Sequence, residues 1–344
     1  MVQLRLAFAL GITSLGGAGW VSGASGQTAG LQELWCSKGS PAFLEFTAVM
    51  GAGFAPDGRV WVSDSQGSLL VYSETGSVER EIGRKGEGPG EFDAPRFIRA
   101  TPEGGVVVFD LGRRSLEYFD TAGNFERRVL LPSTVLNPKG MVVFPNGDVV
   151  VSGGVPTDEA SLHQYTSDGR EVRAWWPDPE PVGHSRSDFY NARYVAGGPI
   201  ARTRSGDLLY SVSAPHAIYR FSIGDTVPIL IASDPNLLVS VLDDFERTFV
   251  NDAGERVIQP RWFFDQSRAV FELGHGTIIN TVTFEDRPVT MFEAYTVEGR
   301  LISRTESDRP YWVWDALPSG RVAASYQDQD TGEHVFCLIQ YSVR

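Results

Sequence analysis

One sequence unit recurs six times along the chain, and this repeat constrains the fold more than any other feature. The unit contains an apolar run, a turn ending in Gly, a second apolar run closed by an aromatic residue, and another Gly turn. Its clearest copy is GFAPDGRVWVSDSQGSLLVYSETG, residues 53–76. The closing aromatic residues mark the period, and they are Tyr72, Phe119, Tyr165, Phe221, Tyr295 and Tyr341. The first two intervals, 72 to 119 and 119 to 165, give a period of about 46 residues, close to one four-stranded propeller blade.

The apolar runs have the composition of short strands in sheets that are buried on both faces. The segments VWVSD (60–64), VVVFD (106–110) and VVVSG (149–153) are rich in β-branched and aromatic residues and follow Gly-containing turns. They are apolar at consecutive positions rather than at alternate ones, so both faces of each sheet should be covered. Propeller blades are covered in this way by their neighbours. A flat sandwich or a solenoid is the alternative, and closure of the ring would discriminate between them.

The two ends of the chain supply that closure. The sixth unit ends after its third strand, at Arg344, whereas LQELWCS (31–37) is a strand-like segment outside all the units. If this segment completes the last blade, Cys36 and Cys337 lie on neighbouring strands, and we expect a disulfide between them. Two buried free thiols are the alternative. The sequence therefore predicts an all-β fold, a six-bladed β-propeller closed by N-terminal strand pairing in the last blade.

The N-terminus has the pattern of a signal peptide over residues 1–26. Arg5 precedes an apolar stretch from Leu6 to Val21, small residues follow in SGASG (22–26), and cleavage is expected near Gln27. A membrane anchor is the alternative, although three glycines dilute the stretch. We expect an exported protein, periplasmic or extracellular, with no stable membrane insertion after signal removal and a single propeller domain over residues 27–344.

The charge balance bears on the class of partner. The chain has 43 acidic and 30 basic residues, a formal net charge of −13. This excess of negative charge argues against nucleic acid as a partner, because such binding needs extended basic contact with phosphates.

Two motifs resemble those of a known family. The pattern F-x-P-D-G-x-V-W-V-S-D occurs from Phe54 to Asp64, and G-x-x-G-x-G-P-G-E-F-x-x-P occurs from Gly83 to Pro95. The chain resembles the NHL-repeat-like six-bladed β-propellers of bacterial exported proteins. The resemblance is good in the first two units and degenerate from the fourth onwards. It implies a scaffold and says little about activity.

The Gly-rich loop GRKGEGPGEF (83–92) also invites a phosphate-binding interpretation. A phosphate loop has a helix after it and a Ser or Thr after its Lys, but Lys85 is followed by Gly86 and then by a strand, RFIRAT (96–101). We therefore expect the loop to be a linker between the first two blades.

Two linkers are longer than the period requires. One is WWPDPEPVGHSRSDFYNARY (175–194) and the other spans about residues 231–259. The second contains a predicted short helix, DPNLLVSVLDDFERTF (234–249), capped by Asp234 and with an apolar stripe. The stripe would be buried against the ring, or alternatively would form a lid over the channel.

Candidate site residues lie at the starts of predicted inner strands, where Arg recurs beside aromatic residues. They are Arg96, Tyr190, Arg193, Arg261, Trp262, Tyr311 and Trp312. This combination suits an anionic or carbohydrate ligand stacked on rings. The alternative is that the aromatic residues pack between blades and the arginines pair with carboxylates.

Catalytic signatures are scarce. The five histidines have no paired metal-ligand spacing, and no cofactor is expected; DQDTGE (328–333) has only part of a calcium-loop pattern, and a polar hairpin tip fits it better than calcium. Our first hypothesis is a propeller that binds a small ligand or an envelope protein through its linker face, rather than an enzyme. The alternatives are a propeller enzyme of the metal-dependent lactonase or lyase kind, and a structural interaction module of the cell envelope.

Overall fold

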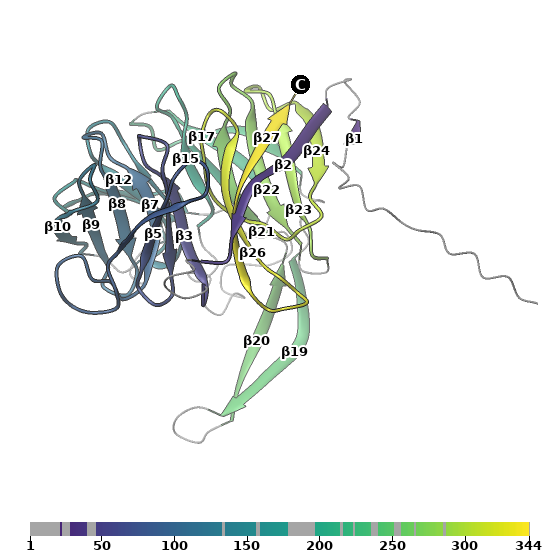
Figure 1. The fold of residues 1–344 in the computed structure, drawn as a ribbon. Coiled ribbons are helices and arrows are strands. Elements are labelled where there is room, and N and C mark those ends of the chain that lie inside the picture. Colours follow the sequence, from purple (N-terminus) through teal and green to yellow (C-terminus); the bar gives the residue numbers. More distant parts are fainter. Residues whose placement is uncertain are drawn as a thin grey trace, which may run out of the picture.

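The fold is built from β-strands alone in the part of the chain that the computed structural model describes. That part comprises residues 21–22, 28–39, 46–132, 135–155, 159–177, 197–213, 216–222, 224–234, 240–250, 256–264, 266–284 and 287–343. Six antiparallel sheets of four or five strands form the blades of a β-propeller, and one two-stranded sheet lies outside them (Figure 1). No helix of the described residues is long and apolar enough to span a membrane.

The first three blades follow the repeat units in order. The first contains β3 (Val49–Phe54), β4 (Val60–Asp64), β5 (Leu69–Tyr72) and β6 (Val78–Ile82). The second contains β7 (Pro95–Ala100), β8 (Val106–Asp110), β9 (Ser115–Phe119) and β10 (Phe125–Leu130). The third contains β11 (Leu136–Val143), β12 (Val149–Gly154), β13 (Leu162–Tyr165) and β14 (Glu171–Trp175).

The next two blades have the same order. The fourth contains β15 (Ile200–Arg202), β16 (Leu208–Val212), β17 (Ala217–Phe221) and β18 (Ile229–Ser233). The fifth contains β21 (Gln266–Glu272), β22 (Ile278–Thr283), β23 (Thr290–Tyr295) and β24 (Leu301–Glu306). The closing aromatic residue of the repeat ends the third strand in each of these five blades, and all six closing aromatic residues are buried. The repeat period is thus confirmed as the blade period.

The first strands of the blades form a closed ring. Neighbouring members contact each other in the sequence β3, β7, β11, β15, β21, β25 and back to β3. This closure confirms the six-bladed propeller and excludes the flat sandwich and the solenoid.

The sixth blade combines the two ends of the chain. It contains β25 (Trp312–Ala316), β26 (Arg321–Gln327), β27 (His334–Val343) and the N-terminal strand β2 (Thr28–Ser37), with β1 (Val21–Ser22) beside β2. Strand β2 pairs antiparallel with β27, and Cys36 lies opposite Cys337 in the register. The two form a disulfide with a Cα–Cα distance of 4.1 Å. The predicted closure and disulfide are confirmed, and the free-thiol alternative is wrong.

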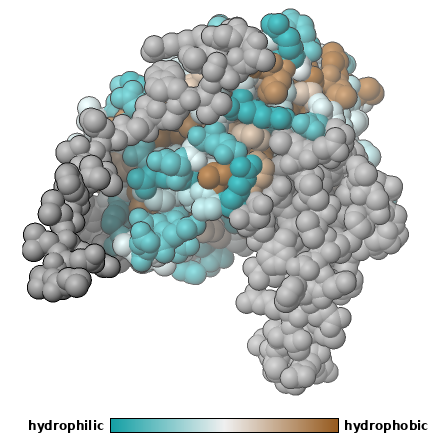
Figure 2. Space-filling view, turned by 90° about the vertical axis from the view of Figure 1, so that its right-hand side faces the viewer, coloured by the Kyte–Doolittle hydropathy of each residue, from teal (hydrophilic) through white to brown (hydrophobic). Residues whose placement is uncertain are grey.

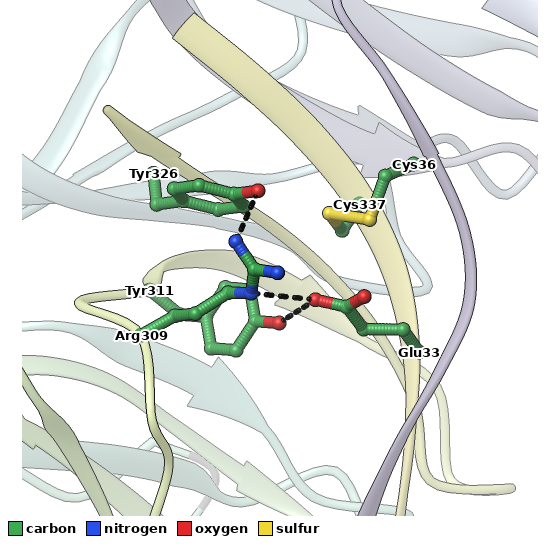
Figure 3. Close-up of a disulfide and its surroundings, with 6 residues drawn as sticks. All are labelled: Glu33, Cys36, Arg309, Tyr311, Tyr326 and Cys337. Carbon is green, nitrogen blue, oxygen red and sulfur yellow. Dashed lines mark hydrogen bonds and ion pairs between the residues drawn. A yellow bond between two sulfur atoms is a disulfide. The ribbon is translucent and has the colours of Figure 1, made fainter. Parts of the chain in front are cut away.

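A polar cluster reinforces this closure beside the disulfide (Figure 3). The Glu33 carboxylate on β2 lies 3.1 Å from Nε of Arg309 and accepts a hydrogen bond from the Tyr311 hydroxyl. Arg309 Nη1 also donates to the Tyr326 hydroxyl at 2.6 Å. Arg309 and Tyr311 belong to the segment that enters β25. The N-terminal strand is therefore fastened by a covalent bond, a strand ladder and an ion pair.

Buried aspartates hold the linkers against the second strands of the first two blades. Asp64 Oδ2 accepts a hydrogen bond from the Thr47 amide at 2.9 Å, and Asp110 Oδ2 accepts one from the Asp93 amide at 2.8 Å. Both aspartates thus bond to the linker of their blade in an equivalent way.

The Gly-rich loop joins β6 to β7 and is confirmed as a linker. The Glu91 carboxylate accepts hydrogen bonds from the Gly88 amide at 2.7 Å and from Arg84 Nε at 2.6 Å. Lys85 lies 3.7 Å from the Asp93 carboxylate. The basic groups of the loop are thus paired with its own acidic groups.

The predicted helix over residues 234–249 is not confirmed. Residues 240–250 instead form strand β19 (Ser240–Val250), which pairs with β20 (Arg256–Phe264) in a hairpin that projects from the blades (Figure 1). Helix capping and periodicity are weak preferences that a pairing strand can override. Both segments are rich in β-branched and aromatic residues, so each offers the other a suitable ladder.

The described residues on the side of the molecule shown in Figure 2 are mostly hydrophilic at the surface. Hydrophobic residues form small groups among hydrophilic ones over the described part of that side. Such scattered groups are normal on a protein surface.

A buried polar network joins the fourth and fifth blades. Glu293 on β23 is fully buried, and its carboxylate lies 2.9 Å from His216 Nε2 and accepts hydrogen bonds from Tyr295 and Asn280. Burial by itself would raise the pKa of Glu293. The hydrogen bonds and the charge of His216 outweigh burial and hold that pKa below its usual value of 4.5.

We expect loss of the disulfide to destabilise the fold strongly. The bridge spans 301 residues, and opening so long a loop releases much chain entropy in the unfolded state. The double variant Cys36→Ala/Cys337→Ala should lose about 3–5 kcal/mol of unfolding free energy, measured by urea denaturation. The native protein in reductant should unfold at a similarly lowered urea concentration. An unchanged urea midpoint in the double variant would contradict this role.

The Glu293 network should make stability depend on acid pH. Because the folded pKa lies below the unfolded one, its stabilising contribution is present above pH 4.5 and is lost as pH falls through the folded value. Urea midpoints measured from about pH 6 to about pH 3 should fall more steeply for the native chain than for Glu293→Gln. Parallel pH profiles would show that Glu293 does not act in this way.

Candidate ligand-binding site in the channel

The ring of first strands surrounds a channel with two neighbouring cavities that share part of their lining. A cavity of about 100 Å³ lies where the inner strands begin, and a larger one of about 420 Å³ extends towards the ends of these strands. Both are lined by Lys139, Arg268, Trp312 and Trp314. We call the smaller cavity the channel mouth; its remaining lining is Arg96, Phe97, Pro138, Gly197, Gly198, Pro199, Ser213, Gln266 and Ser267.

The channel mouth is cationic although the protein as a whole is acidic. Arg96, Lys139 and Arg268 line it, and none of its described lining residues is Asp or Glu. The chain carries a formal net charge of −13. A concave region of one charge sign attracts ligands of the opposite sign.

Local backbone irregularity positions the three cations. Each lies within a register shift near the start of its inner strand: Arg96 between Pro95 and Ile98 on β7, Lys139 on β11, and Arg268 on β21. A β-bulge adds a residue to one strand and re-aims its side chain. The repeat thus brings one cation from each of the second, third and fifth blades to the same cavity.

Burial and the crowding of like charges lower the pKa values of basic groups in the channel mouth. Burial, followed by the charges of Arg268 and Arg96, lowers the pKa of Lys139 from 10.5 to about 8. Burial also lowers the pKa of Arg96, whose Nε finds no hydrogen-bond partner among the described residues. An arginine remains charged under these conditions. The mouth therefore holds two permanent positive charges beside an amine that titrates close to neutral pH.

Two tryptophans form one wall. The Trp312 and Trp314 rings stack with centroids 5.5 Å apart, and the Arg268 guanidinium lies 3.7 Å from the Trp312 ring centroid. Trp314 Nε1 donates to Ser325 Oγ at 2.8 Å, whereas Trp312 remains 38% exposed. This wall offers a flat apolar surface directly beside a positive charge.

Arg99 spans the channel below the mouth. Its Nε donates to the Met141 carbonyl on β11 at 2.8 Å, and its Nη2 donates to the Trp314 carbonyl on β25 at 3.0 Å. Its Nη1 lies 3.8 Å from the Asp315 carboxylate. Arg99 thus joins three inner strands, which gives it a structural role distinct from that of the three mouth cations.

The predicted site residues fall into four groups. Arg96 and Trp312 line the channel mouth. Tyr311 is 3% exposed and packs in the core, so its ring does not line the mouth. Arg261 and Trp262 are on the hairpin strand β20, since the fifth inner strand begins at Gln266 rather than near residue 261. Tyr190 and Arg193 lie outside the described residues.

Lys139, Arg268 and Trp314 were missed by sequence reasoning. The sequence pattern that indicated the site is an Arg beside an aromatic residue, and Lys139 has Pro138 and Gly140 as its neighbours. Arg268 was missed because the hairpin residues 256–264 resemble an inner strand. The repeat register would have found both, because Arg96, Lys139 and Arg268 occupy the same shifted position in their blades.

Metal-ligand groups do not gather in the described channel. In the described chain the one close group of three His, Cys, Asp or Glu residues is Glu33, Cys36 and Cys337, and its two sulfurs form the disulfide. In the hairpin DQDTGE, Asp328 accepts hydrogen bonds from the Asp330 and Thr331 amides, and Glu333 pairs with Lys38. Asp328 therefore bonds within the turn, and Glu333 bonds to the N-terminal segment through Lys38.

Comparisons with solved structures show the same fold at low sequence identity. A Bacteroides fragilis protein whose name describes it as exported matches with a TM-score of 0.58 and 12% identity, covering 94% of this chain and 97% of its own. A gluconolactonase from Xanthomonas campestris matches with a TM-score of 0.53 and 12% identity, covering 90% and 89%. A virginiamycin B lyase from Staphylococcus aureus matches with a TM-score of 0.50 and 13% identity, covering 90% and 99%. No protein-family model and no curated protein matches the chain, so the NHL-repeat resemblance is not confirmed.

Proposed function

We propose that this protein binds a small anionic ligand in its channel mouth. The observation that carries the proposal is the set of three cations, Arg96, Lys139 and Arg268, in a cavity whose described lining contains no carboxylate. Burying like charges together is unfavourable unless an anion compensates them. Paired guanidinium groups suit a carboxylate or phosphate in particular.

The size of the channel mouth and its exposed tryptophan ring restrict the class of ligand that the site suits. A cavity of about 100 Å³ next to one of about 420 Å³ suits a small molecule better than a protein surface. The exposed Trp312 ring favours a ligand with a flat or apolar portion next to its anionic group.

The alternative of a metal-dependent lactonase is less well supported. Such an enzyme needs acidic ligands in its channel, and the described channel lining offers Asp315 and Glu272. Asp315 Oδ2 accepts a hydrogen bond from the Phe54 amide, and Glu272 Oε2 accepts one from the Arg204 amide. Both carboxylates therefore bond to the scaffold.

Binding should depend on the mouth arginines. We expect phenyl phosphate and benzoate to quench tryptophan fluorescence or release heat in calorimetry, whereas the neutral analogue benzyl alcohol does neither. Arg268→Gln should weaken anion binding by about tenfold or more, because it removes a charge in a partly desolvated site. Affinity should also fall with added salt.

Arg287→Gln is the matched control for that experiment. Arg287 pairs with Glu306 at 2.6 Å on the surface and does not line the channel mouth. Equal loss of affinity in both variants, or equal binding of benzyl alcohol and benzoate, would contradict a specific anion site.

We further propose that the protein acts outside the cytoplasm. The disulfide supports this, because such bonds persist in oxidising compartments. The signal pattern over residues 1–26 and the shared fold with a protein described as exported agree with it.

Export has a direct test in a bacterial host. The full chain should be recovered from the periplasm with residues near 1–26 removed and both cysteines oxidised, as measured by intact mass. A variant lacking residues 1–26 should stay in the cytoplasm with free thiols. Recovery of the uncleaved chain from the cytoplasm would contradict export.

A further inference from the structure

The chain contains three lysines, and their surroundings differ sharply. They are Lys38, Lys85 and Lys139. Lys38 pairs with Glu333 and Lys85 lies 3.7 Å from Asp93, both with more than half of the side chain exposed. Lys139 lies in the channel mouth, and no carboxylate of the described residues forms an ion pair with it. Lys38 and Lys85 are thus ordinary surface lysines, whereas Lys139 lies in a cavity beside two arginines.

The charges around Lys139 favour its neutral form. Arg96 reaches the mouth from β7 and Arg268 from β21, and both oppose protonation of the Lys139 amine. Among the described residues, the other charged groups that line the channel are Arg99, Arg202, Arg204, Glu272 and Asp315. Of these, the two acids bond to backbone amides, as described above. Among the described residues that line the two cavities, basic side chains therefore outnumber acidic ones.

A neutral amine is a nucleophile, whereas an ammonium group is not. With a pKa of about 8 in place of 10.5, Lys139 holds roughly 300 times more free amine at neutral pH than an unperturbed lysine. Desolvation next to other cations is a known way to activate a lysine in this sense.

We propose that Lys139 is a reactive amine that condenses with the carbonyl group of an anionic ligand held by Arg96 and Arg268. The ligand class is then small carboxylates or phosphates that also carry an aldehyde or a ketone. This inference rests on the proposed anion site and adds a covalent step to it.

The step balances without any oxidant or reductant. The lone pair of the Lys139 nitrogen attacks the carbonyl carbon, and the C–O π pair moves to oxygen, which takes a proton released by the nitrogen. In the resulting carbinolamine, the C–O bond breaks as the nitrogen electron pair forms the C=N bond, and the hydroxyl group leaves as water with the second proton of the nitrogen. The reverse steps release the ligand, so the adduct is reversible.

The arrangement of the mouth suits such a ligand. The two guanidinium groups hold the anionic end and neutralise its charge, while the Trp312 ring covers a flat portion. Holding the anion beside the amine raises the effective concentration of the carbonyl group at the nucleophile.

Pyridoxal 5′-phosphate is a suitable probe, because it combines an aldehyde, a phosphate and a flat ring. The full-length protein would be incubated with it near pH 7.5, reduced with borohydride and digested, and each lysine peptide would be quantified by mass spectrometry. We expect Lys139 to be modified at least about tenfold more than Lys38 or Lys85, as its larger free-amine fraction requires. Equal modification of the three lysines would overturn the inference.

Two further measurements separate this step from binding. Pyridoxine 5′-phosphate lacks the aldehyde, and it should bind the native chain and Lys139→Arg with affinities within about threefold, since the charge is kept. Lys139→Arg should form no reducible adduct in the channel while keeping its urea midpoint. Arg268→Gln removes a positive charge that holds the phosphate, so it should weaken binding of pyridoxine 5′-phosphate. It also removes a charge that opposes protonation of Lys139, so it should slow modification of that lysine.

The outcomes distinguish the two proposals. If pyridoxine 5′-phosphate, phenyl phosphate and benzoate all fail to bind, the anion site itself is wrong. If the anions bind as expected but Lys139 is modified no faster than Lys38, the anion site stands and the reactive amine is overturned. Adduct on Lys139 that excess phenyl phosphate does not suppress would likewise overturn the inference, because the phosphate would not be held in the mouth.

Discussion

The pairing of β2 with β27 is the interaction on which the rest of the structure depends. Each of the other five blades is made from one continuous stretch of chain, but the sixth needs strands from both ends. The ladder, the Cys36–Cys337 disulfide and the Glu33–Arg309 ion pair all act at this one seam. Since the inner strands contact each other in a circle, fastening this seam holds all six in their places around the channel.

The candidate site is a product of that circle. Arg96, Lys139 and Arg268 come from three blades that are far apart in sequence, and only ring closure brings them to one cavity. Their position within local register shifts gives them a common direction. A symmetric scaffold with small irregularities can therefore concentrate charge that would be unfavourable on a single strand.

More of the fold than of the candidate site could be predicted from the sequence. The buried aromatic markers such as Tyr72 and Tyr341, the spare strand around Trp35 and the two cysteines are local signals with long-range consequences, and the structure agrees with all of them. The segment that forms β19 was predicted as part of a helix because its capping residue and apolar spacing also suit one, and its pairing with β20 cannot be read from that segment alone.

The site was harder because a cavity has no local sequence pattern. Arg96 and Trp312 were found by their position at the starts of inner strands, but Tyr311 points its hydroxyl to Glu33 instead of into the mouth. Lys139 could be found only by comparing equivalent positions between blades. Which side chains meet at the axis depends on register shifts of single residues, and such shifts are invisible in composition or periodicity.

The seam between the ends also sets an order of assembly. As the chain is made from its N-terminus, β2 appears before every strand of the first five blades, and its partner β27 appears last. Cys36 must wait through the synthesis of about 300 residues before Cys337 exists, while each intervening blade can already pair its own strands. Strand β2 is thus synthesised before the first five blades but can pair with β27 only after all of them have been made.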